Sequence, residues 1–173
     1  MAREECVEFL NRQGDVLRGI LHYCDNGKDR RVTIITLNTG LNDMVGWHRL
    51  QLKLARYLAD NGYNVLRFDN SGIGNSGGEI EEGPVNEIFA RIETGHWSQD
   101  AASAIDFIEN MLPGNRHVFV GFCGGALTAI HSAAWDKRVN GVVDIAGPVV
   151  LSNEEIADKK DPWSVQENVK NYK

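Results

Sequence analysis

Strand-like and helix-like segments alternate along most of this chain, and this alternation constrains the possible folds more than any other feature of the sequence. Residues 32–37 form a run rich in β-branched residues, which is typical of a strand buried on both faces. Further strands are expected at residues 64–69, 117–122 and 139–145, with a helical pattern before each of them. Strands that alternate with helices form a largely parallel sheet that the helices cover. The chain is therefore predicted to be an α/β protein.

Three helices are predicted between these strands. Leu50, Leu54 and Leu58 recur at helical spacing and mark the expected buried face of the first helix. Ser98 is the expected N-cap of the second helix, and a stretch rich in small residues, 124–135, predicts the third. Ligands of such sheets bind beyond the carboxyl ends of the parallel strands, so functional residues are expected in the loops that follow strands.

An antiparallel hairpin is predicted at the N-terminus. Residues 5–10 and 16–24 are the expected strands, and the segment between them is rich in turn-forming residues. The length of 173 residues fits one domain. Residues 1–150 are expected to form that domain, and the polar residues 151–173 are expected to be the start of a lid-like segment or a tail.

The charge balance restricts the classes of partner. The chain has 24 acidic and 18 basic residues and a formal net charge of -6, which argues against nucleic acid or an anionic membrane surface as the main partner. No apolar run reaches the roughly 20 residues that cross a bilayer, and the first residues lack the apolar core of a signal peptide. The three cysteines are an odd number without metal-ligand spacing, as is typical of a reducing compartment. We therefore expect a cytoplasmic protein that binds no metal.

Cys123 is the strongest candidate for a catalytic residue. It stands in Gly121-Phe-Cys123-Gly-Gly125, between a predicted strand and a predicted helix, in the Gly-x-nucleophile-x-Gly pattern of a nucleophile elbow. Such a nucleophile occupies a strained turn, so the residues two positions before and after it need to lack side chains. The following helix favours the thiolate, and the Gly124 N–H is placed to donate to an oxyanion. The alternative interpretation is a buried structural cysteine at a tight turn.

Several other segments resemble one family in their order and spacing. Trp47-His-Arg-Leu-Gln51, Asn64-Val-Leu-Arg-Phe-Asp69 and Gly72-Ile-Gly-Asn-Ser76, together with the elbow, resemble the α/β-hydrolase superfamily over residues 31–148. Within it the chain is similar to serine-aminopeptidase-like and exosortase-associated hydrolases, and the latter also carry cysteine at the elbow. The resemblance implies a mostly parallel α/β-hydrolase-type sheet with helices on both faces. It also implies attack on the carbonyl of a small ester, thioester or related acyl substrate, without a cofactor.

The resemblance further implies roles for residues around the elbow. Gly40, in the loop Asn38-Thr-Gly40-Leu-Asn42, matches the glycine of the family's oxyanion loop. The Leu41 N–H is therefore expected to be the second oxyanion donor, beside that of Gly124. The residues expected to line the substrate site are Gly40, Asn42 and Phe122.

The base and the acid have weaker candidates. His48 follows the oxyanion loop and His96 precedes the second helix, so each is a candidate base or rim residue, with a structural role as the alternative. Asp144 lies inside the last predicted strand, a few residues before the position where some relatives carry their acid. In the family the acid usually follows a seventh strand and the histidine an eighth. Those last two family strands, with both residues, are expected to be missing here.

Three explanations fit such a pattern. The chain is a truncated fragment, a natural half that pairs with a second polypeptide, or a degenerate relative that binds without catalysis. Loss of two strands would expose the edge of the strand at 139–145, so a homodimer or a partner segment is expected there. An enzyme would then take its base from outside this chain or from an unusual internal histidine. The alternative function is a non-catalytic binding or scaffold protein.

The segment Gly72–Gly77 also matches the G-x-G-x-x-G pattern of dinucleotide sites. The acidic, broken segment 79–84 that follows does not open an amphipathic helix, which disfavours nucleotide binding. The resemblance instead makes the glycine segment a structural turn, and Asp69 the residue that organises it.

Overall fold

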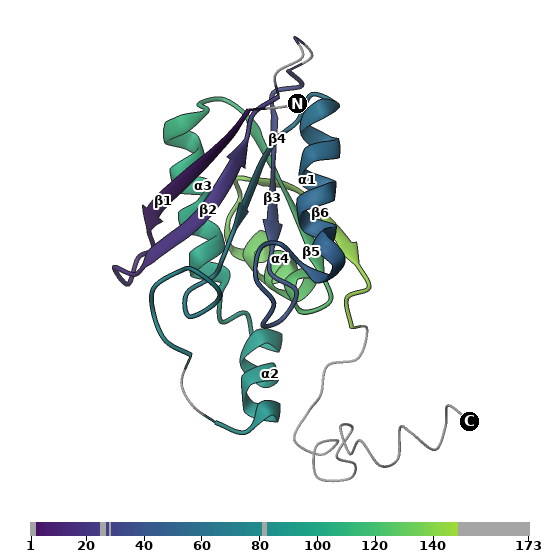
Figure 1. Ribbon diagram of the computed structural model, residues 1–173. Helices are drawn as coiled ribbons and strands as arrows, with labels where there is room; N and C mark the ends of the chain where they lie inside the picture. Colours follow the sequence, from purple (N-terminus) through teal and green to yellow (C-terminus); the bar gives the residue numbers. More distant parts are fainter. Residues whose placement is uncertain (1–2, 25–26, 28, 81–82, 149–173) are drawn as a thin grey trace, which may run out of the picture.

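The central strands of the sheet are formed by the apolar, β-branched segments of the chain (Figure 1). This computed structural model describes residues 3–24, 27, 29–80 and 83–148. The strands are β1 Glu4–Leu10, β2 Val16–His22, β3 Val32–Leu37, β4 Asn64–Phe68, β5 Arg116–Phe122 and β6 Val139–Ile145. They form one sheet in the order β1-β2-β4-β3-β5-β6, in which β4, β3, β5 and β6 are parallel and β1 and β2 are an antiparallel hairpin. The predicted α/β class and N-terminal hairpin are confirmed.

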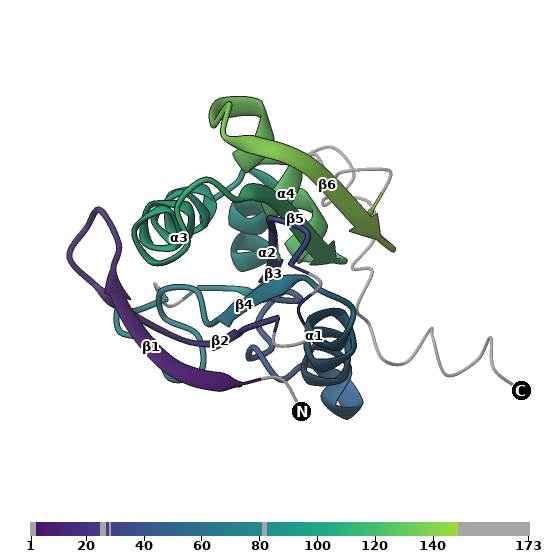
Figure 2. The ribbon, with the colours of Figure 1, turned by 90° about the horizontal axis from the view of Figure 1, so that it is seen from above.

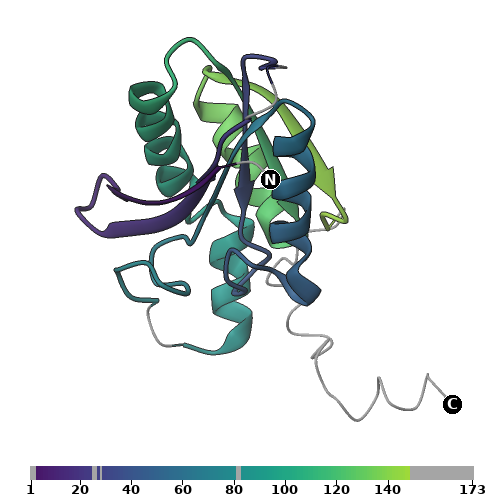
Figure 3. The same cartoon turned by 45° about the horizontal axis from the view of Figure 1, so that its top comes forward.

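Helices cover both faces of this sheet (Figure 2). The helices are η1 Trp47–Arg49, α1 Leu50–Asp60, α2 Val85–Glu93, α3 Ser98–Met111 and α4 Gly124–Trp135. One face carries α1, and the other carries α3 and α4. The helix α2 lies beyond the carboxyl ends of the parallel strands, close to the start of α4 (Figure 3). Among the described residues, no helix combines the length and the apolar character needed to cross a membrane.

The core occupies both faces of the central strands. Phe68, Phe119 and Ile105 belong to the larger cluster, which lies between the sheet and the helices α3 and α4. Val65 and Ala55 belong to a smaller cluster beneath α1. All six residues of β3 are buried, as expected for a strand covered on both faces. Full burial of one large apolar side chain stabilises a fold by about 1.5–3 kcal/mol, so these clusters hold the sheet and the helices together.

The buried face of α1 differs from the predicted one. Gln51, Ala55 and Ala59 are buried at a spacing of four residues, whereas Leu50 is 49% exposed and Leu54 is half-buried. The small alanine side chains allow the helix to approach the sheet closely. The leucine spacing indicated the helix correctly, and Leu54 and Leu58 pack against the core at the side of the fully buried stripe.

The helix α2 interrupts a segment for which no helix was predicted. Its apolar residues Ile88, Phe89 and Ile92 recur at helical spacing, and Pro84 stands before the first turn, where proline is tolerated. Ile92 is buried, and Phe89 packs against the same small cluster. The apolar spacing of α2 is clear in the sequence, but the helix is short and directly follows the acidic, broken segment 79–84, so it was overlooked.

The start of α3 is also stabilised differently from the prediction. Trp97 rather than Ser98 stands at the N-cap, and no side chain caps the helix there. Instead, the buried Asp100 carboxylate in the first turn accepts hydrogen bonds from the Ser71 N–H at 2.7 Å and from Asn11 Nδ2 at 2.9 Å. Its negative charge also complements the positive end of the helix dipole.

One edge of the sheet exposes apolar side chains. Within the residues that the structure describes, β6 pairs only with β5, and Val143 and Ile145 are 45% and 37% exposed. An exposed strand edge is a template for pairing with another strand. The expected homodimer or partner segment at this edge stays a prediction. The predicted lid-like segment or tail, residues 151–173, lies outside the described residues.

His22, at the end of β2, is fully buried. Arg67 Nε donates to His22 Nε2 over 2.9 Å, so the proton of this histidine sits on Nδ1, which lies 3.4 Å from a Glu4 carboxylate oxygen. Burial and the Arg67 charge lower the pKa of His22 to about 4. The folded protein therefore holds this histidine in its neutral form near pH 7.

We expect the free energy of unfolding to fall as the pH is lowered from 6.5 to 4. The unfolded chain binds a proton at His22 near pH 6.5, whereas the folded chain binds it only near pH 4, so stability rises with pH between these values. At roughly 1.4 kcal/mol per pKa unit, this residue contributes about 3 kcal/mol above pH 6.5 and loses it by pH 4. Urea denaturation at a series of pH values measures the slope. The variant His22→Gln keeps an acceptor for Arg67 but does not titrate, so an unchanged slope in it would contradict this account.

Candidate active site

The elbow is a strained turn between β5 and α4. Cys123 has φ 51° and ψ -118°, a conformation that residues with side chains rarely adopt. Its N–H donates to the Ile145 carbonyl over 3.0 Å, and its carbonyl accepts from the Ala126 N–H over 2.9 Å. Strain of this kind persists only where the surrounding structure holds it. The turn leaves the Cys123 side chain exposed at the carboxyl edge of the sheet, so this cysteine is not a buried structural one.

Two glycines make this turn possible. A Cβ at Gly121 would collide with the carbonyl group of Gly125. A Cβ at Gly125 would lie 2.6 Å from the Asn38 carbonyl oxygen and 2.8 Å from that of Leu37. These are backbone atoms of a buried strand and its loop, so they cannot move aside cheaply. The predicted need for glycine on each side of the nucleophile position is confirmed, and part of its cause is the close approach of α4 to the end of β3.

Gly124 brings a second loop to the elbow. A Cβ at Gly124 would lie 3.4 Å from the Cα and the N of Gly40, and 3.0 Å from Ile92 Cγ2. The predicted oxyanion-loop glycine therefore packs directly against the residue after Cys123. Within the described part of the chain, no hydrogen bond occupies the N–H of Leu41 or of Gly124. An oxyanion hole requires free N–H groups beside the nucleophile. The roles of the Gly124 and Leu41 N–H groups as oxyanion donors stay predictions.

The β3–α1 loop (residues 38–46) is held by buried polar side chains. Asn38 Nδ2 donates to the Asn42 carbonyl over 3.0 Å. Asp69 accepts the Met44 N–H over 2.6 Å, and Arg67 donates to the Met44 carbonyl over 2.9 Å. No sequence pattern singled out Asn38 or Arg67, because Asn38 meets Asp69 and Arg67 meets Met44 across more than twenty positions of the sequence. One available signal was the charged residue Arg67 inside the mostly apolar strand β4.

Asp69 also organises the glycine turn that follows β4. Its Oδ2 accepts the Asn75 N–H over 3.0 Å, and a Cβ at Gly74 would collide with this carboxylate. Ser76 Oγ donates to the Asp69 carbonyl over 2.5 Å. The next helix, α2, begins only at residue 85, so the glycine motif does not place a phosphate site at a helix N-terminus. The predicted role of Asp69 in a structural turn is confirmed.

Cys123 stands at the N-terminal end of α4, and it has no side-chain partner among the described residues that could act as a base. Within the described residues, no hydrogen bond or ion pair joins Cys123 to a histidine or a carboxylate. The same part of the chain holds no group of three or more His, Cys, Asp or Glu side chains that could bind a metal ion.

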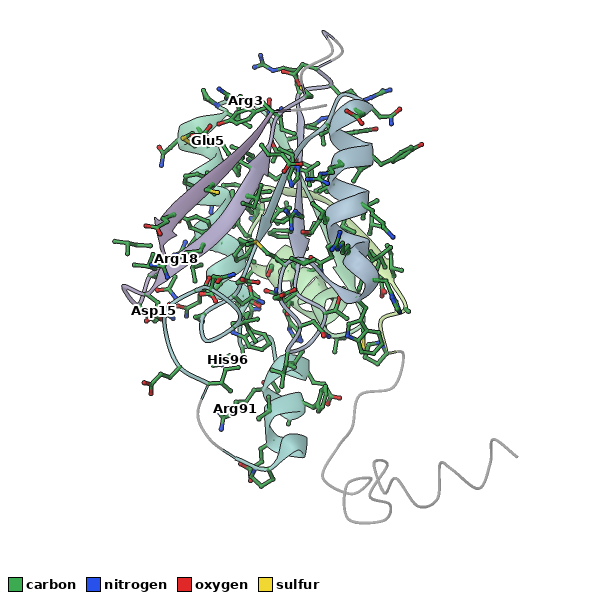
Figure 4. All side chains as sticks on the ribbon, viewed as in Figure 1. Arg3, Glu5, Asp15, Arg18, Arg91 and His96 are labelled. Atoms are coloured by element: carbon green, nitrogen blue, oxygen red, sulfur yellow. The ribbon has the colours of Figure 1, made fainter. Side chains whose placement is uncertain are left out.

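The two candidate histidine bases are exposed. His48 lies in η1 with φ 50°. His96 lies between α2 and α3, near the lower end of the molecule in Figure 4, and its ring meets Trp97 edge-on with centroids 5.4 Å apart. With His131, it lines a groove of about 550 Å³ between α3 and α4, and the residues that line this groove do not include Cys123. A catalytic role for His48 or His96 stays a prediction.

Asp144 serves the turn after β6. It stands opposite Gly121 in the register of β5 and β6, and its exposed carboxylate accepts the Gly147 N–H over 2.7 Å. Its role as a catalytic acid stays a prediction. Two further histidines lie in a strand and a helix. His117, in β5, is buried, and Nε2 of His131, in α4, lies 2.6 Å from the Glu93 carbonyl oxygen.

The residues expected to line the substrate site differ in their hydrogen bonds and in their exposure to solvent. Both ends of the Asn42 amide have a partner: its Nδ2 donates to the Thr39 carbonyl at 2.8 Å, and its Oδ1 accepts from Trp47 Nε1 at 2.7 Å. Phe122 is half-buried and packs against the core cluster beneath α1. Leu41 and Trp47 are 43% and 74% exposed, so the loop that carries Gly40 also presents apolar surface. Contact of any of these residues with a substrate stays a prediction.

Comparison with known proteins identifies the family of this fold. A family model described as the alpha/beta hydrolase fold matches residues 32–171. The chain is 33% identical over 142 residues to an uncharacterized protein of Pseudomonas aeruginosa, a match that covers 79% of this chain and 35% of that protein. It is 30% identical over 141 residues to the polyketide transferase GrgF of a Penicillium species, covering 81% of this chain and 44% of GrgF. The chain thus spans less than half the length of these curated relatives.

Solved structures share the same arrangement of strands and helices. The crystal structure of GrgF superposes with a TM-score of 0.69 at 22% identity, covering 84% of this chain and 46% of that one. An esterase of Pyrococcus furiosus superposes with a TM-score of 0.67 at 25% identity, covering 83% of this chain and 50% of the esterase. The sheet and helices described above therefore correspond to about half of each of these structures.

Proposed function

The chain belongs to the alpha/beta hydrolase fold family, and we propose that it is a hydrolase or acyl transferase that acts on a small ester, thioester or related acyl substrate through Cys123. One relative is a polyketide transferase and another is an esterase. These two names support acyl transfer, to water or to another acceptor, as the class of reaction. The elbow supplies the reason to place the reaction at the cysteine.

The proposed reaction has two steps. In the first, the Cys123 thiolate attacks the acyl carbon, and the carbonyl electron pair moves to the oxygen, which the Leu41 and Gly124 N–H groups stabilise. The carbonyl then re-forms, the bond to the leaving group breaks, and the leaving group departs with the electron pair and takes a proton. In the second step, water or another acceptor attacks the resulting thioester, which releases the acyl group and restores the thiol.

One observation carries this proposal. The strained backbone of Cys123 holds an exposed thiol at the N-terminal end of α4, and the next residue, Gly124, packs against Gly40 and has no hydrogen bond on its N–H within the described residues. A structural cysteine needs neither an exposed sulfur nor a strained φ. Backbone strain of about 1–3 kcal/mol occurs most often at functional positions.

The described residues supply no partner that could act as a base for Cys123. An exposed cysteine can attack an activated ester without a base, but no side chain among the described residues is then placed to activate water against the thioester. We therefore expect this chain to form an acyl adduct readily and to release it slowly.

The test is intact-mass spectrometry after mixing the chain with p-nitrophenyl acetate. We expect one acetyl group on the wild-type chain and none on the Cys123→Ala variant. The matched control is Cys6→Ala, which removes a thiol that is also exposed but lies on the edge strand β1. This control is expected to acetylate like the wild type. Equal acetylation of the wild-type chain and Cys123→Ala would contradict the assignment of the nucleophile.

A non-catalytic binding protein is the competing function. The lack of a base partner for Cys123 within the described residues favours it. The acetylation measurement also distinguishes the two functions, because a binding protein does not require a reactive thiol. Complete absence of an acetyl adduct on the wild-type chain would favour the binding protein.

A further inference from the structure

Two buried charges of opposite sign hold the β3–α1 loop at a single residue. The Met44 N–H donates to Asp69 Oδ1 over 2.6 Å, and the Met44 carbonyl accepts from Arg67 over 2.9 Å. Arg67 is 4% exposed and Asp69 is 0% exposed. The side chains of residues 67 and 69 share one face because alternate residues of a strand point the same way. Met44 is thus held between a cation and an anion that both come from the end of β4.

Buried charges of this kind are costly unless their partners are well placed. Arg67 directs its Nε to His22 and another guanidinium nitrogen to Met44. Asp69 directs one carboxylate oxygen to Met44 and to Asn38 Nδ2, at 2.6 Å and 3.3 Å. Burial raises the pKa of Asp69, and its hydrogen bonds from Asn75, Met44 and Asn38 oppose this rise and so favour the carboxylate. Burial lowers the pKa of Arg67, but a guanidinium is too basic to lose its proton near neutral pH. The proposed reaction uses neither charge directly.

The loop between the two held positions carries the proposed oxyanion donor. Asn38 lies at the start of the loop, where its Nδ2 binds Asp69 and the Asn42 carbonyl. Met44 lies near the end of the loop. Leu41 stands between them, one residue after Gly40, which packs against Gly124. The hydrogen bonds at Asn38 and Met44 therefore restrict both ends of the loop segment that carries Leu41.

We propose that Arg67 and Asp69 are positioning residues that hold the Leu41 N–H in place over Cys123. This inference rests on the proposed function, because it gives the loop the role of an oxyanion donor. Arg67 and Asp69 act through Met44 and Asn38. Displacement of a reacting group by about 1 Å lowers a rate by about 100-fold. Loss of either charge is therefore expected to slow acylation without removing the nucleophile.

The first variant to test is Asp69→Asn, which removes the negative charge and replaces one acceptor oxygen by a donor. We expect acetylation of Cys123 by p-nitrophenyl acetate to slow by about 10- to 100-fold. Alkylation of Cys123 by iodoacetamide forms no oxyanion and is expected to keep its rate. Hydrogen–deuterium exchange at residues 39–47 is expected to rise, because the loop loses its fixed point.

A second variant keeps the inference testable if Asp69→Asn fails to fold. Arg67→Lys keeps the positive charge but lacks the planar group that serves His22 and Met44 together. We expect it to slow acetylation and to raise exchange in the same segment. The matched control is Ser76→Ala, which removes hydrogen bonds to the Asp69 carbonyl and from the Arg18 N–H but none to the loop. It is expected to acetylate at the wild-type rate.

The outcomes separate this inference from the proposed function. Wild-type acetylation rates in both Asp69→Asn and Arg67→Lys would overturn the inference while leaving the proposed function intact. If the wild-type chain takes no acetyl group, the proposed function fails and the exchange measurement decides. Raised exchange at residues 39–47 in both variants then supports the inference that Arg67 and Asp69 hold the β3–α1 loop in place, and unchanged exchange overturns it.

Discussion

Replacement of Gly125 by alanine is expected to lower the free energy of unfolding by about 3 kcal/mol or more, or to prevent folding. The new methyl group would lie 2.6 Å from the Asn38 carbonyl oxygen and 2.8 Å from that of Leu37. Both are backbone atoms at the buried end of β3, so relief requires α4 to move away from the sheet. That movement would also separate Gly124 from Gly40 and open the proposed oxyanion site.

The matched control for this prediction is Gly141→Ala. Gly141 lies in β6, and a methyl group there would meet only Val118 side-chain atoms, the nearest at 3.6 Å, which is ordinary contact. Urea denaturation of both variants measures the difference. We expect Gly141→Ala to unfold close to the wild type and Gly125→Ala to unfold at a much lower urea concentration. Similar midpoints for the two variants would contradict the close approach of α4 to β3.

The variant Cys123→Gly is expected to be more stable than Cys123→Ala and completely unable to form an acyl adduct. Both variants lack the sulfur, so they differ only in the Cβ atom at a backbone φ of 51°. Relief of a strained conformation gains on the order of 1–3 kcal/mol. The greater freedom of glycine in the unfolded chain offsets about 0.5–1 kcal/mol of that gain. A net difference of about 1 kcal/mol in favour of glycine is expected.

Chemical denaturation of the two variants, with acetylation of the wild-type chain measured in parallel, tests this prediction. Higher stability of the glycine variant would show that the elbow stores strain at the position of its nucleophile. Higher stability of Cys123→Ala would mean that the turn is relaxed, and the strain could then no longer support a functional reading of Cys123.

Local patterns in the sequence were sufficient to predict most of the fold. The β-branched run at 32–37 reflects a strand that is buried on both faces, and the alternation of strands and helices reflects a sheet that helices cover. Both features can be seen in the composition of each segment by itself. The buried face of α1 was harder to place. Gln51, Ala55 and Ala59 are buried because the helix lies close to the sheet. The spacing of leucines in the sequence gives no information on that distance. The helix α2 was missed although its apolar spacing is clear, because it is short and directly follows the acidic, broken segment 79–84.

In the candidate site, too, local sequence patterns predicted some features and missed others. The elbow is a local structure, so its strand, glycines and helix are contiguous in the sequence and were predicted. The contact of Gly40 with Gly124 was expected only through a family resemblance. The pairing of Arg67 and Asp69 with Met44 joins residues more than twenty positions apart. Hydrogen bonds across such separations depend on strand order, which no local pattern reports.

The central claim is that Cys123 is a nucleophile supported by two oxyanion donors. Its most direct test is the release of p-nitrophenolate from p-nitrophenyl acetate in the first turnover, followed by absorbance. We predict a burst of one p-nitrophenolate per chain, followed by slow turnover, in the wild type, and no burst in Cys123→Ala. The absence of a burst in the wild type, or a burst of equal size in Cys123→Ala, would contradict the claim.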